Sequence, residues 1–208
     1  MAQITSGIRS ILSWHWIYDL LQWSVGAHHA RQRALALIPL RPGSRILDIG
    51  CGTGRTLDYL RDVRYQGFDL NQDYIMAAQK RYGRASFNCG DAAAFEWSGD
   101  AEKFDVAIAF ALIHHLDDEA VLRLLHVVRN LLNPGGLFVT LDNCLTDDQS
   151  AMARWFILRD RGQNIRTEQQ YRDLLGQVFG SVETFIHHDL LRIPYTHIFS
   201  RCRPIQSP

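Results

Sequence analysis

The stretch Ile46-Leu47-Asp48-Ile49-Gly50-Cys51-Gly52-Thr53-Gly54 decides the fold of this chain. The apolar run over residues 45–49 predicts a buried strand, and the glycines predict a tight turn that opens a short helix over residues 56–61. Glycine adopts positive φ and lets a ligand approach the backbone closely. Free N–H groups at the start of a helix attract an anionic group. The stretch therefore predicts a strand that ends in a ligand-binding turn.

Short apolar runs alternate with amphipathic stretches after this turn. Strands are expected over 65–70, 85–89, 104–110 and 137–141, and helices over 74–82 and 120–132. In the tail, helices are expected over 147–160 and 167–179, and an antiparallel pair of edge strands over 181–186 and 195–200. Strands that alternate with helices in this way form parallel sheets with crossover helices, so the sequence predicts an α/β fold.

The first 40 residues differ from the rest and predict a helical cap. Apolar residues recur there at spacings of three and four, the period of one helix face: Ile11, Trp14, Tyr18, Leu21 and Val25. This helix either lies over the cleft as a lid or packs plainly against the sheet. A membrane-surface helix is disfavoured because residues 10–30 contain no Lys or Arg. The main domain is expected over 41–208, with a helical insert at 143–180 that contributes to a substrate site.

Composition excludes several classes of protein. The chain has 208 residues, 47% of them hydrophobic, which indicates one globular domain with a small cap. Lys+Arg and Asp+Glu are both 22, so there is no basic excess of the kind that nucleic-acid binding usually shows. No apolar run is long enough for stable membrane insertion, and polar residues interrupt any signal peptide. The four cysteines lack metal-binding spacing, and reduced thiols fit a cytoplasmic location.

Acidic residues follow the second and third expected strands. Asp69 lies 21 residues after Asp48, where a carboxylate accepts hydrogen bonds from two vicinal ribose hydroxyls. Asp91 follows the third strand and is placed to meet an adenine amino group. A dinucleotide fingerprint requires glycine or alanine at position 55, and Arg55 occupies it. The turn therefore favours a nucleotide-type ligand other than a nicotinamide dinucleotide.

Residues 45–142 resemble the class I S-adenosylmethionine-dependent methyltransferases, and within them the small-molecule branch that includes the ubiquinone/menaquinone-type enzymes. The ordered motifs that carry the resemblance are Asp48-Ile-Gly-Cys-Gly-Thr-Gly54, Gly67-Phe-Asp-Leu-Asn71, Gly90-Asp-Ala92, Phe104-Asp-Val106, Ile113-His-His-Leu116 and Leu132-Asn-Pro-Gly-Gly136. The resemblance implies a Rossmann-like three-layer sandwich. Its seven-stranded sheet would be mostly parallel, with one antiparallel strand near the C-terminus.

The resemblance also implies a cofactor, S-adenosylmethionine, with S-adenosylhomocysteine as product. Asp69 would hold the ribose hydroxyls, Asp91 the adenine amino group, and Asp48 would face the methionine half. The full set of expected cofactor contacts is Asp48, Gly50, Cys51, Gly52, Gly54, Asp69, Leu70, Asp91, Ala92, Ala109 and Phe110. Cys51 is expected to be a small buried residue rather than a nucleophile.

Three residues are candidates for a catalytic base: His114 and His115 after the fourth strand, and Asp142 at the end of the fifth. Histidine titrates near neutral pH and suits proton transfer, although a structural role in the loop is an equal alternative. Asp142 either faces the cleft or caps the segment that follows. Metal-dependent chemistry is not expected, because adjacent histidines diverge and no H-E-x-x-H spacing occurs.

The candidate substrate residues are Tyr18, Arg159, Arg161, Tyr195 and His197. The insert contains Arg154, Arg159, Arg161, Arg166 and Arg172. These arginines form either a solvated face with salt bridges or a clamp for a carboxylate or phosphate. The sequence thus predicts metal-independent methyl transfer to a small molecule, driven mainly by proximity and orientation. A nicotinamide-dependent oxidoreductase and a non-catalytic S-adenosylmethionine-binding protein are the alternatives.

Overall fold

The computed structural model describes residues 24–83, 85–91, 103–160 and 162–205. Its strands are β1 (Arg45–Ile49), β2 (Arg64–Asp69), β3 (Ser86–Cys89), β4 (Phe104–Phe110), β5 (Leu132–Leu145), β6 (Arg166–Thr167), β7 (Ser181–His187) and β8 (His197–Arg203). Its helices are α2 (Ala27–Ala36), α3 (Gln72–Arg81), α4 (Asp118–Leu131), α5 (Ala151–Ile157) and α6 (Glu168–Gly176), and its 3-10 turns are η2 (Arg55–Tyr59) and η3 (Ile113–His115).

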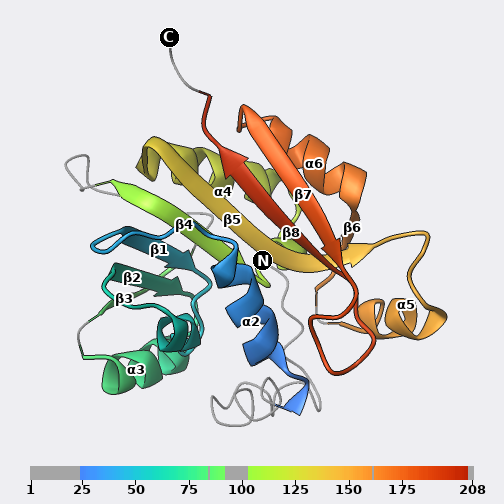
Figure 1. Cartoon of the computed structure of the whole chain (residues 1–208), viewed down its shortest axis with the longest axis horizontal. Coiled ribbons are helices and arrows are strands. Elements are labelled where there is room, and N and C mark those ends of the chain that lie inside the picture. The colour runs from blue at the N-terminus through green and yellow to red at the C-terminus, as the bar shows by residue number, and fades with distance from the viewer. Residues whose placement is uncertain (1–23, 84, 92–102, 161, 206–208) are drawn as a thin grey trace.

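The strands form one twisted sheet in the order β3-β2-β1-β4-β5-β8-β7, with the short β6 beside β5 (Figure 1). Strands β1 to β5 pair in parallel, whereas β8 pairs antiparallel with both β5 and β7. Strand β8 therefore runs against its neighbours, and β7 closes that edge. The predicted α/β sandwich with a reversed C-terminal strand is confirmed.

Both faces of the sheet are covered by helices, which explains why its central strands are largely apolar. Alternate residues of β1 and β4 point to opposite faces. Leu47 and Ala107 pack in the core under α4 and α6, whereas Ile46 and Val106 pack in the core with α2 and α3. Full burial of one aliphatic side chain contributes about 1.5–3 kcal/mol, so these two cores fix the three-layer arrangement.

The glycine turn between β1 and η2 is held against the end of β2. Gly50, Gly52 and Gly54 have φ values of 73°, 56° and 76°, in the left-handed region that favours glycine. The backbone N–H groups of Gly50 and Cys51 both donate to the Phe68 carbonyl, at 2.7 and 3.0 Å. The turn is thus a rigid connection at the carboxyl edge of the parallel strands.

Several element boundaries differ from the sequence expectations. Strand β5 runs from Leu132 to Leu145 rather than over 137–141, because its start pairs with Phe104 and its end with β6 and β8. Helix α5 is shorter than predicted and begins at Ala151, where the Ser150 hydroxyl accepts the Ala153 N–H. The expected helix at 56–61 is a 3-10 turn. The two-residue β6 was not predicted, since two residues show no periodicity.

Residues 24–40 are the described part of the predicted N-terminal cap, and they include helix α2, which contains His28 and His29. This part packs against the segment between β7 and β8, where Arg33 donates to Asp189 at 2.8 Å and the Arg192 N–H donates to the Val25 carbonyl. Residues 1–23 lie outside the described residues, and so does the expectation that they form a lid.

Replacement of Gly67 by Ala is expected to lower the free energy of unfolding by about 1–3 kcal/mol, because its Cβ would overpack a tight core. A Cβ at Gly67 would lie 2.7 Å from the Phe87 ring and 2.9 Å from Cys51 Sγ. Urea denaturation measures the loss. Gly83→Ala is the matched control, since a Cβ there meets no atom within 4 Å. Equal losses in the two variants would contradict the packing argument.

Candidate functional site

Asp69 lies at the carboxyl end of β2 and joins this strand to the glycine turn. Its Oδ2 accepts the Gly52 N–H at 2.8 Å, and its Oδ1 accepts the Asn71 N–H at 2.9 Å. Burial raises the pKa of Asp69, while the N–H groups of Asn71, Gly52 and Leu70 act in the opposite direction. A carboxylate offers about four acceptor sites, so capacity remains for a ligand's hydroxyl groups.

Asp48 lies beneath the turn. The side chain is buried, and its Oδ2 accepts the Tyr65 hydroxyl at 2.6 Å. Burial raises the pKa of Asp48, and hydrogen bonds from Tyr65 and Thr56 oppose that shift. These contacts make Asp48 a support that joins β1 to Tyr65 of β2 and to Thr56 of η2. Its role toward a methionine group stays a prediction.

The other expected cofactor residues lie at the same edge of the sheet. Leu70 follows Asp69 and is 49% exposed, so its side chain is open to a flat ligand. Asp91 follows β3 and is partly buried. Ala109 and Phe110 end β4, where Ala109 is fully buried. Ala92 lies outside the described residues.

His114 and Asp142 form a buried pair at the ends of β4 and β5. The His114 Nδ1 lies 2.8 Å from Asp142 Oδ1, and the His114 backbone N–H donates to the same oxygen at 3.2 Å. Their side chains are 3% and 0% exposed. A carboxylate oxygen accepts hydrogen bonds, so Nδ1 carries a hydrogen, and in the neutral tautomer of this kind the lone pair is on Nε2. The pair is therefore built to accept a proton at Nε2.

The strand register explains this contact. Phe110 at the end of β4 pairs with Leu141 in β5, so the residues after β4 lie beside Asp142. Ala111, which follows β4, has a φ of 55°, which is unusual for a residue other than glycine. Its N–H donates to the Leu141 carbonyl at 2.7 Å. Asp142 lies inside β5, so the predicted alternative that it caps the next segment is wrong. The His115 ring lies 4.2 Å from that of His114.

A second polar group lies next to this pair, between β5, α5 and β8. Asn143 Nδ2 donates to Asp160 Oδ2 at 2.7 Å, and the Tyr195 hydroxyl donates to the same oxygen. His197 pairs with Asn143 across the β5–β8 ladder and is buried. Burial, with a contribution from nearby His114, lowers the pKa of His197 to about 4. The structure thus gathers Tyr195 and His197 with Asn143 and Asp160, and the role of Tyr195 and His197 toward a substrate stays a prediction.

The arginines of the insert separate into different environments. Arg159 is exposed, and its guanidinium lies 4.2 Å from the centre of the Trp155 ring. Arg172 forms a surface ion pair with Glu168 on α6. Arg166 is buried, so the interpretation of all these arginines as a solvated face is wrong for this residue. Arg161 lies outside the described residues, as does Tyr18. The role of Arg159 and Arg161 toward an anionic substrate stays a prediction.

Sequence reasoning missed the contact between Asn143 and Asp160 and the burial of Arg166. No motif marks these residues, because each acts through a partner that is distant in the chain. Within the described residues, no group of three or more His, Cys, Asp or Glu side chains is arranged to hold a metal ion. Among the described helices, none has the length and apolar character needed to cross a membrane.

The lowered pKa of buried His197 predicts that the folded protein loses stability in mild acid. In the folded protein its imidazole stays neutral down to about pH 4, whereas in the unfolded chain it takes up a proton near pH 6.5. The unfolded state therefore binds more protons between these values. Stability falls as the pH drops from 6.5 to 4, by up to about 3 kcal/mol from this group. His197→Phe should reduce this loss in denaturation series at several pH values; an unchanged pH slope would argue against it.

Comparison with known proteins identifies relatives of this chain in sequence and in fold. Residues 46–136 match a protein family described as "Methyltransferase domain". The chain is 32% identical over 116 residues to the 27-O-demethylrifamycin SV methyltransferase of Amycolatopsis mediterranei. This alignment covers 50% of this chain and 40% of that protein. It is 25% identical over 175 residues to the phosphoethanolamine N-methyltransferase of Triticum aestivum, covering 81% of this chain and 34% of that one.

A solved structure confirms the fold over nearly the whole chain. The phosphoethanolamine N-methyltransferase 2 of Haemonchus contortus, in complex with phosphomonomethylethanolamine and S-adenosylhomocysteine, superposes with a TM-score of 0.74 at 16% identity, covering 97% of this chain and 58% of that one. The chain spans between about a third and just over half of the first curated relatives. The match over residues 46–136 agrees with the predicted methyltransferase class, and the narrower ubiquinone/menaquinone branch stays a prediction.

Proposed function

We propose that this chain, whose residues 46–136 match a methyltransferase domain, is a class I S-adenosylmethionine-dependent methyltransferase that moves a methyl group to an oxygen or nitrogen atom of a small molecule. The observation that carries the proposal is the buried His114–Asp142 pair. It lies at the same edge of the sheet as the glycine turn and Asp69. In parallel α/β sheets this carboxyl edge is where ligands bind.

The residues at the edge fit S-adenosylmethionine. Gly52 has a φ of 56°, and a Cβ built on it would meet no atom within 4 Å, so the backbone of the turn is open to a ligand. The Asp69 carboxylate has acceptor capacity for ribose hydroxyls, and Leu70 offers an exposed apolar surface beside it. When bound, S-adenosylmethionine supplies an electrophilic methyl group on a positively charged sulfur.

His114 serves as the general base in this proposal. Asp142 fixes the imidazole in the tautomer with hydrogen on Nδ1, so Nε2 accepts the proton that the acceptor loses. The buried carboxylate then stabilises the imidazolium. A positioned base contributes about 10²–10⁴-fold to the rate. The larger share comes from holding donor and acceptor in line, which supplies about 7–11 kcal/mol in related intramolecular reactions.

The groups around the base favour an acceptor that donates hydrogen bonds. Asp142 and Asp160 are both carboxylates, and Asp142 Oδ2 is a buried oxygen with no hydrogen-bond partner among the described residues. A hydroxyl or amine group complements such a surface. Two relatives point the same way by name, one an O-methyltransferase for demethylrifamycin and the other an N-methyltransferase for phosphoethanolamine.

Calorimetry tests the cofactor site first. The protein should bind S-adenosylmethionine, and Asp69→Ala should weaken binding by about 1–3 kcal/mol, because buried hydroxyl partners lose their acceptor. Asp173→Ala, an acidic residue on α6 that accepts from Gln169, is the matched control. Thermal melting establishes that the Asp69 variant is folded. Saturable binding of a nicotinamide dinucleotide without binding of S-adenosylmethionine would overturn the proposal in favour of an oxidoreductase.

A transfer assay tests the base. With S-adenosylmethionine labelled in the methyl group, a panel of phenols, primary amines and phosphoethanolamine should include at least one acceptor. His114→Asn should then slow transfer about 10²–10⁴-fold while S-adenosylmethionine binding is kept. His126→Asn, which changes an exposed histidine on α4, is the control. Transfer by His114→Asn at the wild-type rate would exclude the base. Tight cofactor binding with no transfer across the panel would favour the non-catalytic alternative.

A further inference from the structure

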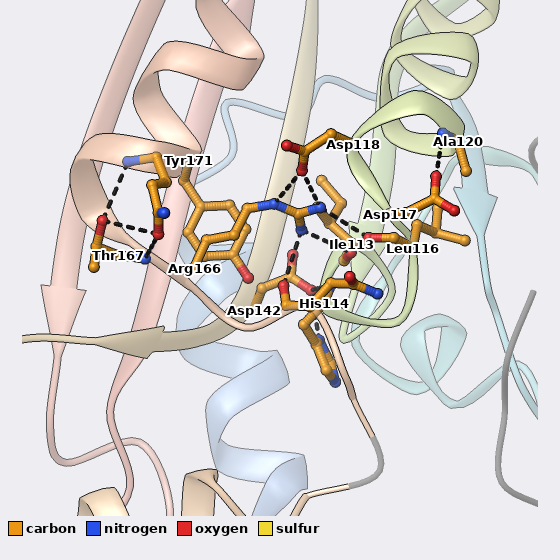
Figure 2. Close-up of polar contacts among 12 residues, drawn as sticks. Ile113, His114, Leu116, Asp117, Asp118, Ala120, Asp142, Arg166, Thr167 and Tyr171 are labelled. Atoms are coloured by element: carbon orange, nitrogen blue, oxygen red, sulfur yellow. Dashed lines mark hydrogen bonds and ion pairs between the residues drawn. The ribbon is translucent and has the colours of Figure 1, made fainter.

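Arg166, in the insert before α6, reaches back to the turn that carries His114. Its Nη1 donates to the Ile113 carbonyl at 3.3 Å, and its Nη2 donates to the Leu116 carbonyl at 2.8 Å. These two carbonyls lie on either side of His114 and His115. Figure 2 shows the guanidinium meeting this turn from one side, while the His114 ring projects away from it toward Asp142.

All five N–H donors of the guanidinium find acceptors. Besides the two carbonyls, Nη1 donates to the Asn164 carbonyl at 3.0 Å. Nε and Nη2 both donate to Asp118 Oδ1, at 2.9 and 2.6 Å. The Arg166 side chain is 8% exposed and Asp118 is 74% exposed, so the charge is paired at the rim of the protein. An ammonium group has three donors without this planar fork, so lysine cannot replace the arrangement.

The same segment also contacts His114 directly. The Asn164 N–H donates to the His114 carbonyl at 3.0 Å. A Cβ built on Gly162 would lie 2.1 Å from His114 Cδ2 and 2.9 Å from the His114 carbonyl oxygen. Only a residue without a side chain allows the segment to lie this close to the imidazole ring. Residues 162–166 therefore cover His114, and Arg166 fastens them to the turn.

We propose that Arg166 is a positioning residue for His114. It fixes the carbonyls on both sides of the histidine and holds Gly162 and Asn164 against it, so that the ring keeps its hydrogen bond to Asp142. Asp142 alone would leave the backbone of the turn less restrained, because without the guanidinium the Leu116 carbonyl loses this donor and the Ile113 carbonyl keeps only its bond from the Leu116 N–H. This inference deepens the proposed function, since it assigns the residue that orients the proposed base.

Nuclear magnetic resonance of the whole chain with 15N-labelled histidine provides the test. The long-range proton–nitrogen spectrum distinguishes the two imidazole tautomers, and the signals of His114 are assigned by their loss in His114→Asn. In wild type, His114 should show the Nδ1–H form. In Arg166→Lys the proportion of this form should fall at least about twofold, and exchange of the Asn164 amide should accelerate about tenfold or more.

Gly162→Ala perturbs the contact between the insert and His114 without changing Arg166. It should lower the proportion of the Nδ1–H form of His114 and accelerate exchange of the Asn164 amide, as Arg166→Lys does. It also decides the test if Arg166→Lys does not fold. The matched controls are Arg172→Lys, a surface ion-pair arginine on α6, and Gly176→Ala, where a Cβ meets no atom within 4 Å. Both should leave the His114 spectrum and the Asn164 exchange unchanged.

A lower melting temperature in Arg166→Lys with an unchanged His114 tautomer would overturn the inference, because it would reduce Arg166 to a structural contact. Unchanged spectra in Gly162→Ala would do the same. These readouts need no acceptor and no turnover. Failure of methyl transfer would therefore count against the proposed function, and failure of the tautomer shift against the positioning role.

Discussion

The whole site depends on the hydrogen bonds that hold the glycine turn against the end of β2. Gly50 and Cys51 donate to the Phe68 carbonyl, and Gly52 donates to Asp69. These bonds place an open backbone and a carboxylate at one edge of the sheet. Because β1 is the strand between β2 and β4 and pairs with both, the end of β4 emerges at the same edge as this turn. A turn displaced from β2 would separate the cofactor residues from the proposed base.

The second constraint is the parallel register of β4 and β5. It brings a histidine from a loop beside an aspartate inside a strand, although 28 residues separate them in the chain. Burial then makes their hydrogen bond consequential, because a desolvated carboxylate strongly prefers a donor. The insert after β5 also contacts this histidine, because Gly162 and Asn164 pack against it. Arg166 holds the insert there through its hydrogen bonds to the turn. Three segments distant in sequence thus converge on one imidazole ring.

The fold was predictable because its signals are local. A few neighbouring residues are enough to predict three of its elements: the glycine turn at 50–54, the strand at 104–110 and the amphipathic helix α4. The positions of Asp69 and Asp142 at one edge of the sheet were predictable because strand ends in parallel sheets share an edge. The position of Arg166 was not, since its environment depends on carbonyls more than 45 residues away. The burial of Arg166 by the turn after β4 results from tertiary contacts, and no sequence motif indicates it.

The central claim is that the ends of β1, β2, β4 and β5 form one site for the methyl donor and the base. The structure of the protein bound to S-adenosylhomocysteine tests it most directly. The claim predicts ribose hydroxyls on Asp69, the adenine beside Leu70, and the sulfur on the side of the turn that faces His114. A ligand bound away from Asp69, or with its sulfur directed away from His114, would contradict the account.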